Sequence, residues 1–163
     1  MAKSIKLKNN TYWDTSCISH NKKLLYERLE HSGTIATLGL SGNWKPSQIG
    51  IATIIPFDQM GFTRTGVFSY SNGEITVLSD AIKGVIIEYH LRCLGMYIYI
   101  WSSSKGCVLG DTGYTSGTVN KNGSISISVS KGEKISIRCY AITSSSVIAG
   151  ASPAWAGATI TSY

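Results

Sequence analysis

The feature that most constrains the fold is a two-residue alternation of apolar and polar side chains, which recurs from residue 44 onward. It is cleanest over residues 124–130, where three aliphatic residues alternate with four serines. Successive side chains of a strand point to opposite faces, so this pattern predicts strands with one face in a core and one in water. Residues 85–93 and 135–140 show the same alternation.

Turn signals separate these stretches. Asn72-Gly73 lies between 66–70 and 74–78, and Asn-Gly is a strong signal for a two-residue hairpin. Further strands are predicted at 50–55, 96–101 and 156–163. About eight short strands with glycine-rich turns, and no strand–helix–strand unit, predict an all-β jelly-roll β-sandwich.

Residues 1–33 have a different pattern. Residues 4–8 alternate as in a short strand or extended arm, and Asn21 can cap a helix over 22–31. Leu24, Leu25 and Leu29 form one apolar stripe on that helix, which is too short to be stable alone. We therefore predict an N-terminal arm and helix at 1–33, a linker at 34–43 and a jelly-roll head at 44–163.

Composition argues against several classes of partner. Charged residues make up only 15% of the chain, and the lysines beyond the N-terminal region are scattered singly, so we expect a solvated basic surface and no nucleic acid. No apolar run approaches the ~20 residues of a membrane helix, and the first residues contain no secretion signal. We expect a protein made in the cytoplasm without disulfides or membrane insertion.

The sequence contains no motif that predicts catalysis. It lacks a G-x-S-x-G motif, a phosphate-binding loop and a dinucleotide fingerprint, and its four cysteines include no C-x-x-C pair. Several of its nine acidic residues fall at turns. We therefore expect no enzyme activity, no metal and no cofactor, with hydrolysis of a cell-wall polymer as the enzymatic alternative.

Residues 44–163 resemble the jelly roll of tumour necrosis factor and of the globular head of complement-type collagenous proteins. The resemblance rests on residues 65–68, 73–77, 84–92, 129–135 and 156–160. Two positions depart from the pattern. Val85 replaces the aromatic residue that commonly follows the glycine of the long strand, and Glu133 replaces the usual aspartate of a turn.

Residues 4–14, with His20-Asn21-Lys22, resemble the opening of bacteriophage minor structural proteins. Together the two resemblances imply a homotrimeric virion appendage that docks on other phage structural proteins through its N-terminus. In this interpretation Tyr12, Trp13, Leu25 and Leu29 serve virion attachment, and the jelly roll faces the host.

Residues 96–101 carry aliphatic side chains on one face and Tyr97, Tyr99 and Trp101 on the other. Three aromatic residues exposed on one strand would be unusually adhesive. The jelly-roll resemblance favours a trimer interface for them. The alternative is a platform on which aromatic rings stack against a sugar.

Loops are the more plausible place for a ligand, because they vary without disturbing the sandwich. Residues 102–118 contain Lys105, Asp111 and Tyr114, and residues 144–155 end in Trp155. Lysine can pair with phosphate, aspartate can accept sugar hydroxyls and aromatic rings can stack on sugars. These four residues are the candidate saccharide site.

The resulting hypothesis is a receptor-binding or tail-fibre tip protein that attaches to a host cell-wall or capsular saccharide without cleaving it. A structural head-fibre or decoration protein with no receptor is the main alternative, and a cytokine-like bacterial trimer is another.

Overall fold

The computed structural model describes residues 4–6, 12–14, 33–64, 66–110, 113, 116–150 and 156–163. None of these residues lies in a helix. The helix predicted over 22–31 falls outside the described residues. Near the N-terminus, β1 (Ser4–Lys6) pairs antiparallel with β2 (Tyr12–Asp14).

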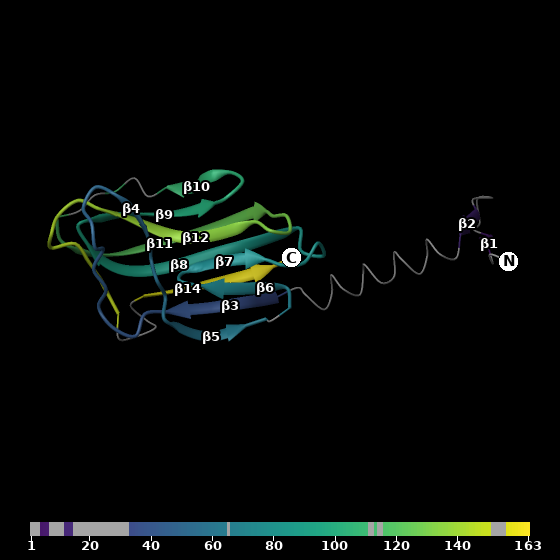
Figure 1. Ribbon diagram of the computed structural model, residues 1–163, viewed down its shortest axis with the longest axis horizontal. Coiled ribbons are helices and arrows are strands. Elements are labelled where there is room, and N and C mark those ends of the chain that lie inside the picture. The colour runs from purple at the N-terminus through teal and green to yellow at the C-terminus, as the bar shows by residue number, and fades with distance from the viewer. Residues whose placement is uncertain are drawn as a thin grey trace.

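Two six-stranded antiparallel sheets form the β-sandwich (Figure 1). One sheet has the order β10-β9-β12-β7-β6, with β4 also paired to β12; the other has the order β11-β8-β14-β3-β5, with β13 also paired to β8. The strands of the first sheet are β4 (Ala52–Ile54), β6 (Phe68–Ser71), β7 (Glu74–Val77), β9 (Met96–Ser102), β10 (Gly106–Gly110) and β12 (Lys134–Ala141). Those of the second are β3 (Gly33–Gly39), β5 (Gln59–Thr63), β8 (Gly84–Leu94), β11 (Thr118–Ser128), β13 (Val147–Ala149) and β14 (Ala156–Ser162).

The predicted alternation is confirmed where the strands are long. Along β8 the five side chains at alternate positions from Val85 to Cys93 are at most 5% exposed, whereas Glu88, His90 and Arg92 point outward. The inward side chains of β9, β12 and β14 add further residues to this core. The fully buried large side chains of this core are Ile35, Ile55, Ile75, Ile87, Leu91, Met96, Ile98, Ile100, Ile135, Ile148, Val77 and Val85.

The predicted hairpin between β6 and β7 is also confirmed. Asn72 and Gly73 have φ angles of 50° and 82°, the left-handed pair that a type I′ turn requires. The turn is held closely against the chain that follows β4, because a β-carbon on Gly73 would lie 2.2 Å from the carbonyl oxygen of Ile55.

The predicted linker at 34–43 is wrong for most of its length. Gly33–Gly39 forms β3, a strand between β14 and β5, and Ile35, Ala36 and Leu38 are buried. Register shifts interrupt both pairings of β3, one of them between Thr37 and Leu38. A β-bulge of this kind breaks the two-residue period, which is why the stretch does not show the alternation of a strand. The sandwich therefore begins at Gly33.

The two predicted loops at 102–118 and 144–155 also contain strands. β10 lies within the first, and β13 lies within the second. These short strands carry few side chains, and unlike β6 and β7 they are not marked by an Asn-Gly turn.

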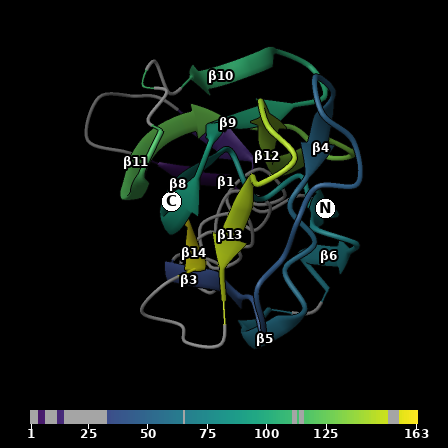
Figure 2. The same cartoon turned by 90° about the vertical axis from the view of Figure 1, so that its left-hand side faces the viewer.

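The sandwich has two distinct ends. At one end Gly33 pairs with Ser162 and Ser128 with Gly84, and we call this the entry end because residues 1–32 join here. At the other, the far end, Thr118 and Val147 both pair with Leu94. Figure 2 views the far end, where β13 lies beside β8.

Replacing Gly73 with alanine tests how tightly the hairpin turn is held. A β-carbon at position 73 would clash with the backbone of Ile55, and the residue also has a left-handed φ of 82°. A β-carbon on Gly132, which has a similar φ of 84°, would have no described atom within 4 Å. We expect Gly132→Ala to cost about 1–2 kcal/mol from backbone strain. Gly73→Ala should cost about 1–3 kcal/mol more, because the neighbouring backbone must move. Urea unfolding of both variants measures the difference, and equal losses would contradict the close packing of this turn.

Candidate functional site

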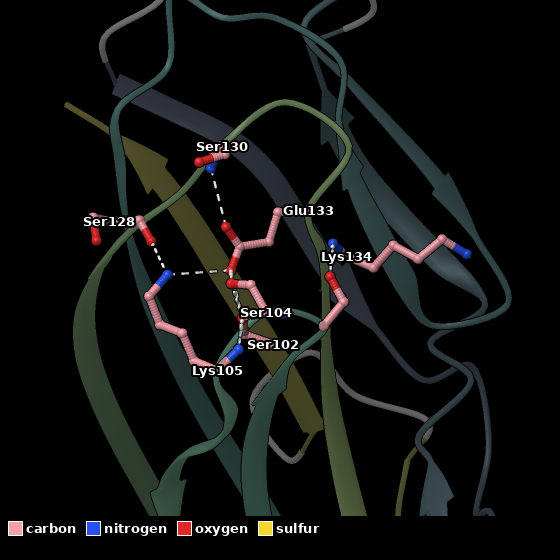
Figure 3. A network of polar contacts seen from close by, with 8 residues as sticks. Ser102, Ser104, Lys105, Ser128, Ser130, Glu133 and Lys134 are labelled. Atoms are coloured by element: carbon pink, nitrogen blue, oxygen red, sulfur yellow. Dashed lines mark hydrogen bonds and ion pairs between the residues drawn. The ribbon is translucent and has the colours of Figure 1, made fainter.

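A buried carboxylate ties two turns together at the entry end (Figure 3). Glu133, which is 5% exposed, lies in the turn between β11 and β12. Its Oε1 accepts hydrogen bonds from the hydroxyls of Ser102 and Ser104, the latter at 2.6 Å, and its Oε2 accepts one from the amide of Ser130 at 3.0 Å. We call this group, together with Lys105, the Glu133 clamp.

Lys105 completes the clamp. Its Nζ lies 3.3 Å from Oε1 of Glu133 and donates a hydrogen bond of 2.6 Å to the carbonyl of Ser128. The ammonium thus links the turn after β9 to the end of β11. This contact gives Lys105 a part in holding the fold, and its predicted part in saccharide binding stays a prediction.

The environment of Glu133 favours its charged form. Burial by itself raises the pKa of the carboxyl, but hydrogen bonds from Ser102, Ser104, Ser130 and Lys105 outweigh it and hold the pKa below its ordinary value. Glu133 is therefore a satisfied structural anion.

The other predicted ligand residues, Asp111, Tyr114 and Trp155, lie outside the described residues. Their described neighbours can be placed. Gly110, next to Asp111, pairs with Tyr99 of β9; the carbonyl of Gly113, next to Tyr114, accepts a hydrogen bond from Nζ of Lys121; and Ala156, next to Trp155, pairs with Leu91. Lys121 and Ala156 both pair with Leu91, so the neighbours of Tyr114 and Trp155 lie toward the far end, whereas Lys105 lies at the entry end.

The predicted attachment residues are described only in part. Tyr12 and Trp13 lie in β2, where they pair with Lys6 and Ile5 of β1. Leu25 and Leu29 lie outside the described residues. The role of all four in virion attachment stays a prediction.

The aromatic row of β9 lies on the outer surface of the sandwich, as its alternation predicted. Met96, Ile98 and Ile100 are fully buried, whereas Tyr97, Tyr99 and Trp101 are half-buried and point away from the core.

Strand β12 adds two residues to this surface that sequence reasoning missed. Arg138 pairs with Tyr99, and the 40%-exposed Tyr140 pairs with Tyr97. The guanidinium carbon of Arg138 lies 3.8 Å from the centre of the Trp101 ring, which is a close cation–π contact. We call these five residues the aromatic face. The alternation along β12 could have placed Arg138 and Tyr140 outside, but only the pairing of β9 with β12 brings them to the tyrosines.

Further contacts position the charged and polar groups of the aromatic face. The Nε of Arg138 donates a hydrogen bond of 3.0 Å to the hydroxyl of Ser136. The Nζ of Lys121, from β11 of the other sheet, lies 6.0 Å from the centre of the Tyr97 ring. Burial raises the pKa of Tyr99, so its hydroxyl stays neutral and can both donate and accept.

Two open pockets occur elsewhere on the described surface. One, of about 530 Å³, lies beside β3 and β5 and includes Asp58, whose carboxylate accepts hydrogen bonds from the amide and hydroxyl of Ser41. The other, of about 290 Å³, lies at the far end between β8, β11 and β13.

Two kinds of feature are absent from the part of the chain that the structure describes. No three histidine, cysteine or acidic side chains gather as metal ligands there, and no helix there could span a bilayer.

Comparison with known proteins identifies the fold. Murine APRIL superimposes with a TM-score of 0.60 at 7% identity, over 80% of this chain and 99% of that one. The globular domain of zebrafish complement 1qA gives 0.53 at 15% identity, over 81% and 95%. No protein-family model and no curated protein sequence matches the chain. At these identities the likeness shows the fold alone, and it confirms the predicted jelly roll shared by tumour necrosis factor and complement heads.

Replacing Glu133 with glutamine tests the clamp. At neutral pH we expect Glu133→Gln to lower the free energy of unfolding by about 1–3 kcal/mol, because buried donors lose a charged acceptor. The folded-state pKa of Glu133 is depressed, so its contribution is complete above the ordinary value near 4.5 and is lost as pH falls through the folded-state value.

The gap between wild type and Glu133→Gln should therefore narrow as pH falls below about 4.5, as followed by urea unfolding across pH. Glu74→Gln is the matched control, because Glu74 pairs with the exposed Lys134 at 2.9 Å and such surface pairs contribute about 0–1 kcal/mol. A pH-independent gap would contradict the role assigned to the Glu133 carboxylate.

Proposed function

We propose that this chain is a non-enzymatic virion appendage whose jelly-roll head attaches to a host cell-surface saccharide without cleaving it. The proposal joins the resemblance of residues 4–14 to phage structural proteins with the jelly-roll fold of residues 33–163. The observation that carries the binding part is the aromatic face, where Arg138 lies over Trp101 beside three tyrosines.

The chemistry of this face suits a sugar. The flat rings of Tyr97 and Tyr99 offer apolar surface for the C–H side of a pyranose, and their hydroxyls can hydrogen-bond to its hydroxyls, whereas one face of Trp101 is already covered by Arg138. Arg138 can form two parallel hydrogen bonds with a phosphate or carboxylate on the same polymer.

The charge of Arg138 also helps to decide whether Tyr97, Tyr99 and Trp101 form a trimer interface or a ligand surface. Burying a guanidinium in a dry interface without a carboxylate partner costs several kcal/mol. A solvated surface that meets an anionic polymer carries no such cost. The position of Arg138 therefore favours the sugar platform, which the sequence left open, over the trimer interface predicted for Tyr97, Tyr99 and Trp101.

The direction of the chain supports attachment through the N-terminus. Residues 1–32 join the sandwich at the entry end, which is also the end that holds the Glu133 clamp. If these residues dock on the virion, then the far end and the surfaces that the trimer leaves exposed stay available to the host.

The head is proposed to act as a homotrimer. Several weak sites on one particle raise the overall strength of attachment far above that of a single site. Weak binding by an open sheet face is therefore sufficient for this function.

Tyr140→Ala and Arg138→Gln test the aromatic face. We expect each variant to lower binding to intact host cells and to purified wall polysaccharide by about tenfold, as central aromatic and arginine residues of binding surfaces do. Tyr163→Ala is the matched control, because Tyr163 is 60% exposed beside the other sheet and its hydroxyl pairs with Ser126 at 2.7 Å. It should bind as wild type does.

The mass of each variant in solution, recorded on the same samples, distinguishes a ligand surface from a trimer interface. Variants that stay trimeric and lose binding support the ligand surface, whereas variants that become monomeric support the trimer interface. A wild-type trimer that binds no cell and no saccharide would contradict the proposal and favour a decoration protein. Release of reducing sugars from walls would contradict the non-enzymatic role.

A further inference from the structure

A second pocket, on the sheet opposite the aromatic face, combines an apolar floor with a polar rim. It lies at the far end, has a volume of about 290 Å³ and is lined by Asn43, Arg92, Cys93, Leu94, Thr118, Val147 and Ala149. We call it the Arg92 pocket.

The pocket exists because β8 changes partner along its length. β14 pairs with β8 only as far as Leu91, and from Arg92 to Leu94 the short strand β13 takes its place. Ala149 lies opposite Arg92 and Val147 opposite Leu94. The small side chain of Ala149 leaves space beside the arginine.

Hydrogen bonds hold the wall of the pocket that Asn43 forms in place. Trp44 and Ile148 exchange two hydrogen bonds of 2.9 Å, and the side-chain oxygen of Asn43 accepts a hydrogen bond of 3.1 Å from the amide of Gly150. A β-carbon on Gly150 would lie 2.0 Å from the carbonyl oxygen of Gly42, so this approach needs glycine. The amide group of Asn43 is thus positioned before any ligand arrives.

The lining favours an anionic ligand. It contains one guanidinium, one amide and one hydroxyl, and none of its seven residues carries a carboxylate. On the outward face of β8, His90 is the next residue before Arg92, and Asn120 of β11 pairs with Arg92. Leu94, Val147 and Ala149 are half-buried and supply the apolar contact.

We propose that the Arg92 pocket binds one anionic sugar unit, with the carboxylate or phosphate on Arg92, ring hydroxyls on Asn43 and Thr118, and the C–H side of the ring on Val147 and Ala149. The volume of about 290 Å³ lies just below the range of about 300–1,000 Å³ for small-molecule sites, which suits a ligand as small as one ring. The pocket and the aromatic face lie on different sheets, so this proposal does not rest on the function proposed above.

The binding of four probes to the full-length protein tests the proposal. They are glucuronate, glucose 1-phosphate, glucose and inorganic phosphate, and binding is followed by ligand-observed nuclear magnetic resonance titration. At least one of the two charged sugars should bind about tenfold more tightly than both glucose and inorganic phosphate, because only it uses the guanidinium and the apolar floor together. The preferred charged sugar identifies carboxylate or phosphate as the natural group.

Two variants locate the site by different means. Arg92→Gln removes the charge, and Ala149→Leu fills the floor while leaving Arg92 in place. Each should weaken binding of the charged sugar by about tenfold or more. The matched controls are Lys83→Gln, which removes an exposed charge near the entry end, and Thr34→Leu, which adds volume at an exposed position of β3. Both should bind as wild type does.

Three results would overturn the proposal. They are no binding of either charged sugar, equal binding of inorganic phosphate and glucose 1-phosphate with no binding of glucuronate, and unchanged binding by both Arg92→Gln and Ala149→Leu. Loss of cell attachment in aromatic-face variants that still bind the charged sugar would separate the two sites from each other.

Discussion

Burial of one face of β8 is the constraint on which the rest of the structure depends. This strand pairs with β11 along its whole length, with β14 over most of it and with β13 at its end. Its five inward side chains lie in the common core of both sheets. A slip of one residue would turn Glu88, His90 and Arg92 into that core, which is too costly to occur. The register of β8 therefore decides that Arg92 faces outward, where it lines the Arg92 pocket.

The sandwich separates the Glu133 clamp, which stabilises the fold, from the two surfaces proposed to bind ligands. At the entry end the Glu133 clamp satisfies a buried charge from within the fold, with donors from the end of β9, from the turn that follows it and from the turn between β11 and β12. At the aromatic face and at the far end, cationic side chains lie at the surface beside apolar groups. Lys105 of the clamp stabilises the fold, whereas Arg138 and Arg92 are proposed to bind a ligand. No sequence motif distinguishes these two roles.

The two proposed surfaces share one principle, which is a planar guanidinium next to apolar surface. Arg138 lies over Trp101 on an open face, and Arg92 borders a small pocket with an aliphatic floor. An open face suits an extended polymer, whereas a pocket of this size suits one unit of it. Anionic polysaccharides present both a chain and repeated charged units, so a single receptor of this class could engage both surfaces.

The sequence by itself determined the fold class and the orientation of the long strands, because the two-residue period is a local property of the chain. It placed Tyr97, Tyr99 and Trp101 on the outer face of β9 and the turn at Asn72-Gly73. It missed β3, whose bulge breaks the period, and also β5, β10 and β13, which are short and are not marked by an Asn-Gly turn as β6 and β7 are. Only the tertiary structure brought Arg138 to Trp101, Lys105 to Glu133 and Ala149 to Arg92. Each of these pairs forms because particular strands or turns become neighbours. The pairing of strands within the two sheets and their packing around one core determine which ones do.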